Sequence, residues 1–198
     1  QVAAKQVLNA DRMHDHLAAL DVLRAMFGGS SSDECDSVQQ RMQPVVRPAD
    51  GSFWKQDQRA LGILYSNLAL QDSALGRSHA AIETFKKALE LHRAVGDEEG
   101  LAVTYGQLGK TYLLAGQPRQ AERCLNNACE HFIKLGNGTG ETGALRLLAD
   151  LYEQEGDLPP AIRCLERITQ LTLAYRLSHS EANAARLTRL RQQASGRM

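Results

Sequence analysis

The sequence is poor in aromatic residues, carries no net charge and has no long hydrophobic run. Aromatic side chains make up 5% of the 198 residues, and 23 basic groups balance 23 acidic ones. A chain without excess positive charge produces no global field that would attract nucleic acid or an anionic membrane. No apolar run approaches the ~18 residues that a membrane-spanning helix needs. We therefore expect neither a nucleic acid nor a membrane as partner.

The chain also has few cysteines, and their spacing fits neither a metal site nor a disulfide framework. None of the four forms a C-x-x-C pair, and Cys124 and Cys164 lie forty residues apart. Isolated cysteines of this kind are typically small residues at the edge of the core, and they stay reduced in a reducing compartment. We therefore expect a cytoplasmic protein with free thiols.

No group of residues has the spacing of a catalytic or cofactor site. His14 and His16 could be drawn as metal ligands, but alternate residues of a helix point to different faces. The glycine-rich residues 136–140 follow no predicted strand, which argues against a phosphate-binding loop. The acidic residues 97–99 begin a helix, where carboxylates interact favourably with the helix dipole. The sequence therefore predicts no enzyme, no metal site and no cofactor.

The dominant feature of the sequence is a pattern that recurs every forty residues. Its central copy lies within residues 101–140 and has matches forty residues back and forty forward. The recurring residues of that copy are Tyr105, Leu108, Gly109, Tyr112, Gly116, Ala121 and Leu125. Gly76, Gly116 and Gly156 are in phase, as are Gly96 and Gly136. A fixed period of this length is the signature of a repeat protein.

Each repeat predicts two antiparallel helices. The six expected helices span residues 53–75, 78–95, 98–115, 118–135, 140–155 and 158–175. Gly76, Gly116 and Gly156 are expected to end the first helices, because a left-handed residue closes the last turn without a Cβ clash. Pro118 and Pro159 suit the first turns of second helices, where a missing N–H costs nothing.

A further helix is expected from about Ser178 to Ala194. A stack of helix pairs needs such an element, because the last pair leaves one apolar side uncovered. The residues expected to cover that side are Ala184, Leu187, Leu190 and Ala194. Those expected to face solvent are Arg186, Arg189 and Gln193. Residues 176–198 carry five arginines against one glutamate, which is typical of a solvated helix face, with an anionic partner as the alternative.

The chain before the repeats has a different pattern. Residues 1–27 have apolar residues at three- and four-residue intervals, which predicts either a degenerate leading repeat or a single long helix. Residues 28–52 begin with a glycine- and serine-rich run and contain two prolines, which predicts a flexible insertion, either disordered or a loose lid. Phe53-Trp54 would anchor the first long helix or, alternatively, form a binding platform.

The recurring residues resemble the tetratricopeptide repeat, whose pattern is W-x2-L-G-x2-Y…A-x3-F…P. The resemblance covers about residues 60–175, and the period of forty replaces the usual thirty-four. This longer form is similar to the repeats of kinesin light chains, Pins-type adaptors and MalT- and Rap-type bacterial regulators. It implies an all-α, right-handed superhelix of helix pairs. We expect three repeats within residues 53–177, at about 53–96, 97–136 and 137–177. A capping helix and tail are expected over residues 178–198.

The resemblance also implies a non-catalytic protein–protein interaction module. In the family, the first helix of each pair lines a concave groove that binds an extended or helical peptide of a partner protein. Carried onto this chain, the groove positions are Ile63, Ser66, Asn67, Leu70, Val103, Gln107, Lys110, Leu114, Arg146 and Asp150. Asn67 and Gln107 can each donate to and accept from a peptide backbone.

The charged groove positions suggest the chemistry of the ligand. Lys110 and Arg146 favour an acidic residue in the bound peptide, and Asp150 and Glu153 favour a basic residue at the far end. The alternative function is the sensor or effector domain of a bacterial regulatory protein, separated from its output domain.

Overall fold

The computed structural model describes residues 52–175 and 180–195, and within them it contains seven α-helices and no strand. The helices are α3 (Ser52–Ala74), α4 (Ser78–Val95), α5 (Glu98–Leu114), α6 (Pro118–Lys134), α7 (Gly138–Glu155), α8 (Leu158–Tyr175) and α9 (Ser180–Ser195). The predicted helices are confirmed, with every described end within two residues of its expected place. The predictions for residues 1–51, and for the side chains of Phe53 and Trp54, lie outside the described part.

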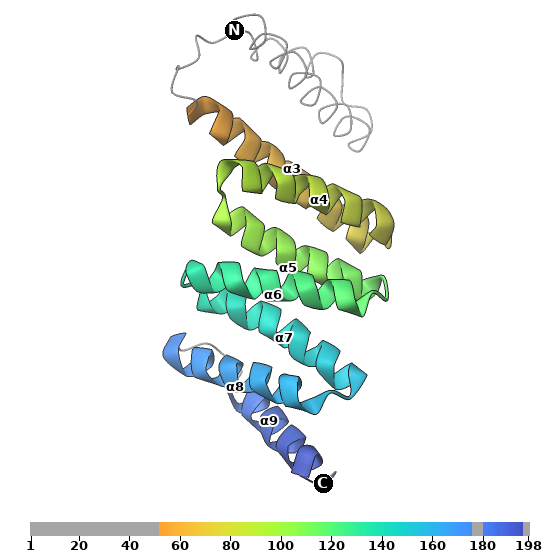
Figure 1. Ribbon diagram of the computed structural model, residues 1–198, viewed down its shortest axis with the longest axis vertical. Coiled ribbons are helices and arrows are strands. Elements are labelled where there is room, and N and C mark those ends of the chain that lie inside the picture. Colours follow the sequence, from red (N-terminus) through yellow and green to blue (C-terminus); the bar gives the residue numbers. More distant parts are fainter. Residues whose placement is uncertain (1–51, 176–179, 196–198) are drawn as a thin grey trace, which may run out of the picture. The chain divides into compact units, whose positions relative to one another are not determined.

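From Gln58 onward the chain forms one compact unit, and within it successive helices pack on one another in chain order (Figure 1). The first helix of one pair also contacts the first helix of the next, as α5 and α7 do. This arrangement is an all-α solenoid of helix pairs. It follows from the sequence because a single pair cannot hide both of its apolar stripes from water.

The glycines that end the first helices take the expected left-handed conformation. The φ angles are +75° at Gly76, +67° at Gly116 and +75° at Gly156. Pro118 begins α6, as predicted. The next first helices, α5 and α7, are capped by Asp97 and Asn137, whose side chains accept hydrogen bonds from backbone N–H groups three residues on. Local chemistry therefore fixes the starts of α5 and α7 and the ends of the three first helices.

The closest helix–helix approaches use the smallest side chains. The recurring alanines are fully buried at positions 69, 81, 121, 149 and 161. Gly109 is buried beside Leu125, and a Cβ atom on Gly109 would lie 2.7 Å from Leu125 Cγ. Two clusters of buried apolar residues result, one formed by α4 with residues of α3 and α5, and one running from α5 to α9.

The last helix, α9, covers the end of the stack with a different face from the one predicted. Leu187 and Leu190 are buried and Ala194 is half-buried, as expected. Ala184 is exposed, so its predicted place in the stripe is wrong, and Asn183 is buried instead. Residues 183, 187, 190 and 194 follow the three- and four-residue spacing of a single helix face.

The prediction for Arg186 is also wrong. Its side chain was expected in solvent, but it is only 23% exposed and forms ion pairs with two carboxylates of α7. A partly buried guanidinium is tolerated there because its charge is compensated and its donors are used.

Candidate functional site

The structure places the ten predicted groove residues on α3, α5 and α7. Seven have exposed side chains: Ile63, Asn67, Leu70, Val103, Lys110, Leu114 and Arg146. Three are half-buried: Ser66, Gln107 and Asp150. We call the surface that these ten positions form the first-helix face. It combines apolar area with amide and charged groups, the mixture that peptide-binding surfaces use.

One part of the first-helix face is hollowed. A hollow of about 300 Å³ lies between α5 and α7. Three of the predicted residues, Val103, Gln107 and Lys110, line its α5 side. Gly143 and Leu147 line the α7 side, and Phe132 of α6 contributes to the lining from the second-helix layer. The hollow therefore offers apolar and glycine surface with one amide and one cation at hand.

The hollow exists because the α5–α7 contact lacks a side-chain pair that the α3–α5 contact has. Between α3 and α5, the hydroxyls of Ser66 and Thr104 are hydrogen-bonded at 2.9 Å. Forty residues on, the same two positions are Gly106 and Ala144, which line the hollow. Two residues without hydroxyls or bulk thus leave open the space that the hydroxyl pair occupies one repeat earlier.

Glycines also shape the hollow from the α7 side. A Cβ atom on Gly140 would clash with the ring of Phe132, so this glycine lets the ring lie against the backbone of α7. A Cβ atom on Gly143 would meet no other atom within 4 Å. Gly140 is therefore required by packing, whereas Gly143 has no steric requirement and only keeps the hollow open.

The charges on the first-helix face are distributed unequally. Lys110 and Arg146 are exposed and have no ion-pair partner among residues 52–175 and 180–195. Asp150, by contrast, lies 2.6 Å from Arg186, and Glu153 lies 2.5 Å from the same guanidinium. Because α9 already supplies a counter-charge to both carboxylates, these ion pairs argue against the expectation that they favour a basic ligand residue.

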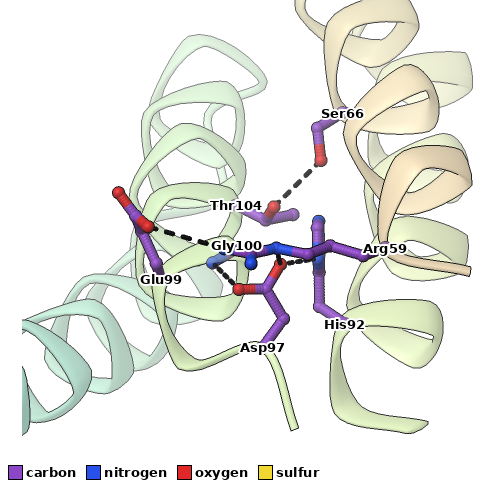
Figure 2. A network of polar contacts seen from close by, with 7 residues as sticks. All are labelled: Arg59, Ser66, His92, Asp97, Glu99, Gly100 and Thr104. Carbon is purple, nitrogen blue, oxygen red and sulfur yellow. Dashed lines mark hydrogen bonds and ion pairs between the residues drawn. The ribbon is translucent and has the colours of Figure 1, made fainter. Parts of the chain in front are cut away.

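A second polar cluster lies at the contact of α3, α4 and α5, where Figure 2 shows it around the carboxylate of Asp97. One carboxylate oxygen is 2.9 Å from Nδ1 of His92 and accepts a hydrogen bond from Arg59 at 3.1 Å. The other oxygen accepts from the backbone N–H of Gly100 at 3.2 Å. Arg59 also lies 3.6 Å from a carboxylate oxygen of Glu99. Asp97 thus ties three helices together.

This cluster is built for packing rather than catalysis. His92 is 1% exposed, and its ring fills a slot made by two glycines. A Cβ atom on Gly62 would lie 2.9 Å from the ring, and one on Gly100 would clash with it. The nearby hydroxyls of Ser66 and Thr104 are hydrogen-bonded to each other (Figure 2). A substrate could not reach a histidine buried in this way.

The remaining reactive groups offer no alternative site within the described residues. Burial raises the pKa of the Cys124 thiol to about 11 and that of Cys129 to about 12, which keeps both thiols protonated at neutral pH. No three His, Cys, Asp or Glu side chains of the described ranges converge as metal ligands would. None of the described helices is long and apolar enough to cross a membrane. His14 and His16 lie outside this part.

Sequence reasoning missed three residues beside the first-helix face, and the forty-residue phase would have found two of them. Phe132 occupies the position of His92, and Gly140 that of Gly100. The third is Arg186, forty residues after Arg146, but α9 does not keep the register of α7, because Asn183 is buried where Gly143 is exposed.

Known structures share this architecture. BtubC from P. vanneervenii is 22% identical with a TM-score of 0.55, over 79% of this chain and 70% of that chain. The nearly identical TPR-like repeats of a protein described as a putative kinesin light chain, from Podosopora anserina, are 19% identical with a TM-score of 0.54, over 66% of this chain and 65% of that chain.

A third similar structure belongs to a much longer protein. It is a Signal Transduction ATPase with Numerous Domains (STAND) protein with a tetratricopeptide repeat sensor, from Pyrococcus horikoshii. It is 18% identical with a TM-score of 0.63, and the match covers 90% of this chain but only 26% of that chain. At these identities the similarity to all three structures is one of fold.

A family model matches part of the sequence. Residues 60–134 match the family model described as tetratricopeptide repeat. This segment includes α4, α5 and α6 and most of α3, and the same helix-pair packing continues through α7 and α8. The chain is therefore a solenoid of the tetratricopeptide repeat fold, with the family's sequence pattern in residues 60–134.

Proposed function

We propose that this chain is a non-catalytic interaction module that binds a peptide segment of another protein on its first-helix face. The observation that carries the proposal is the hollow between α5 and α7, which three of the predicted groove residues line. The bound segment, extended or helical, places one apolar side chain in the hollow. Proteins with tetratricopeptide repeats generally bind other proteins, which supports this class of function.

The polar groups around the hollow are suited to orienting such a segment. Gln107 at the hollow and Asn67 on the neighbouring helix can pair with the peptide backbone in either direction. Lys110 and Arg146 are exposed cations without ion-pair partners in the described chain, and they favour an acidic residue in the segment. Specific binding would thus combine one buried apolar anchor with a few charge and amide contacts.

Filling the hollow tests the proposal. A leucine at position 143 projects into space that is empty in the structure, so Gly143→Leu should leave the fold intact while blocking the anchor. Proteins captured from a native lysate by the wild type should be lost with Gly143→Leu and weakened with Lys110→Glu. Leu173→Ser is the matched control, because Leu173 is exposed on the second helix α8. Partners captured equally by all four proteins would contradict binding at the first-helix face.

A second candidate function is a sensor domain of a bacterial regulator. The observation that favours it is the similarity to the STAND protein with a tetratricopeptide repeat sensor, which extends over 90% of this chain. An ATPase or DNA-binding segment encoded in the same full-length gene would support this candidate. A gene that encodes no such output segment would contradict it and leave the interaction module.

A further inference from the structure

We propose that Arg186 of α9 sets the sign of the ligand charge that the first-helix face accepts. The inference rests on the proposed function, since it concerns the segment bound on that face. Arg186 Nη2 lies 2.6 Å from Asp150 Oδ1, and its Nε lies 2.5 Å from Glu153 Oε1. The second Glu153 oxygen is 3.1 Å from Arg189. The charges of Asp150 and Glu153 on α7 are therefore compensated from α9.

The consequence follows from which charges at the first-helix face lack a counter-charge. Lys110 and Arg146 have no ion-pair partner among the described residues, whereas Asp150 and Glu153 are paired with Arg186 and Arg189. Of the other carboxylates on α5 and α7, Glu98, Glu99 and Glu141 pair with His131, Arg59 and Arg167, and Glu155 is the last residue of α7. Without the arginines of α9, the charges of Asp150 and Glu153 would oppose the attraction of Lys110 and Arg146 for an acidic segment.

A ligand on the first-helix face would lie close enough to the α7 carboxylates to be influenced by their charge. Neighbouring packed helices lie about 8–10 Å apart, which is comparable to the ~10 Å screening length at 0.1 M salt. A segment lying across α5 and α7 is thus within range of the α7 carboxylates and of the arginines that pair with them. Arg186 bridges two carboxylates with charge-assisted hydrogen bonds, and this holds its charge in place more firmly than a single contact would.

The geometry of Arg186 suits this role better than a purely solvated arginine would. Its side chain is 23% exposed, against 59% for Arg189, which forms an ion pair with Glu153. Hydrogen bonds from Arg186 reach both carboxylates, so removing this one residue frees Asp150 and half of the contacts of Glu153. Arg186 is a specificity-determining residue that acts through the α7 carboxylates, without needing to touch the ligand.

The experiment uses three fluorescein-labelled dodecapeptides of one sequence, whose four charged positions are all Glu, all Gln or all Lys. Each contains two leucines as possible anchors, and binding to the full chain is measured by fluorescence anisotropy at low ionic strength. The wild type should prefer the Glu peptide. Arg186→Gln should weaken the Glu peptide at least threefold and strengthen the Lys peptide, and Arg186→Lys should largely retain the wild-type preference.

Two variants separate this role from a merely structural one. In the triple variant Asp150→Asn, Glu153→Gln, Arg186→Gln, the carboxylates are removed together with the arginine, so the preference for the Glu peptide should return. Arg163→Gln removes the same charge from an exposed arginine of α8 and should leave the preference unchanged. Arg189→Gln, at a more exposed position, gives a weaker shift in the same direction should Arg186→Gln fail to fold.

The outcomes distinguish this inference from the proposed function. If Lys110→Glu alters the preference but Arg186→Gln and Arg189→Gln do not, the inference is wrong and the binding face stands. If neither Lys110→Glu nor the arginine variants alter it, both are wrong. A wild type without preference among the peptides, or an equal effect of Arg163→Gln, would also overturn the inference.

Discussion

The same substitution, glycine to alanine, should have three different effects at three positions of this chain. Gly143 lies in the interior of α7, Gly109 lies in the interior of α5, and Gly116 follows the end of α5. Only the first has an ordinary helical conformation with empty space around its missing Cβ. The series therefore separates helix propensity, packing and backbone strain, each with its own sign and size.

Gly143→Ala should stabilise the protein. Alanine is favoured over glycine in a helix interior by about 0.8–1.0 kcal/mol. No atom lies within 4 Å of the new methyl group, so no packing cost opposes that gain. We expect the free energy of unfolding to rise by roughly 0.5–1 kcal/mol. For a chain of this size, each kcal/mol raises the melting temperature by about 2–4 °C.

Gly109→Ala should destabilise the protein although the propensity gain is the same. The new Cβ would lie 2.7 Å and 2.8 Å from two carbons of the fully buried Leu125, and 3.4 Å from the backbone oxygen of Ala121. Overpacking of this kind costs about 1–3 kcal/mol. The clash here is with a side chain that has no free space, so we expect a net loss of roughly 1–2 kcal/mol after the propensity gain.

Gly116→Ala tests the backbone alone. No atom lies within 4 Å of its missing Cβ, but its φ is +67°, where an L-residue is strained by roughly 1–2 kcal/mol. A net loss of about 1 kcal/mol is expected once the lower entropy of the unfolded alanine chain is included.

The assay is urea unfolding of the full chain followed by circular dichroism at 222 nm, with the slope of the transition checked for each variant. From most to least stable, the expected order is Gly143→Ala, wild type, Gly116→Ala and Gly109→Ala. A Gly109→Ala variant as stable as the wild type would show that α5 and α6 do not approach as closely as the structure has them. A less stable Gly143→Ala would show that the hollow is not open.

Three further predictions concern buried groups and the last helix. Burial raises the pKa of the Cys129 thiol to about 12, so at pH 8 an aromatic disulfide reagent should label it only after unfolding. The stability that this neutral thiol contributes is complete below about pH 9 and is lost as the pH rises toward 12. His92→Ala should cost about 2–4 kcal/mol in urea unfolding, whereas His92→Phe, which copies the in-phase Phe132, should cost less than about 1.5 kcal/mol. Ending the chain at Tyr175 should lower the melting temperature and promote aggregation, because it uncovers the apolar surface under Leu190, and an unchanged melting temperature would contradict the capping role of α9.

The sequence predicts the helices and their ends because these depend on local chemistry that repeats. Glycine in a left-handed turn, proline in a first turn and apolar residues at helical spacing act within a few residues of themselves. The alanine positions are predictable for a similar reason, since the repeat places them at the same crossing every forty residues. The fold of residues 52–175 therefore follows from pattern alone.

The hollow does not follow from pattern, because it depends on which side chains meet across two helices. Ser66 and Thr104 are 38 residues apart, and nothing in either segment alone shows that their hydroxyls pair. The rotation of α9 is unpredictable for the same reason. Only one of the adjacent residues Asn183 and Ala184 can face the core, and in the structure it is Asn183. With α9 in this rotation, Arg186 forms its hydrogen bonds with α7.

Positions where one repeat departs from its neighbours are where function can be sought, because the shared pattern already accounts for stability. At one such position the chain has Ile63, Val103 and Gly143 in successive first helices. Glycine there costs about 1 kcal/mol of helix stability relative to alanine, and no neighbouring atom requires it. Gly143 instead lines the hollow between α5 and α7 and leaves it open. This cost in stability at the hollow, beside the cation of Lys110, supports the proposal that the first-helix face binds a ligand.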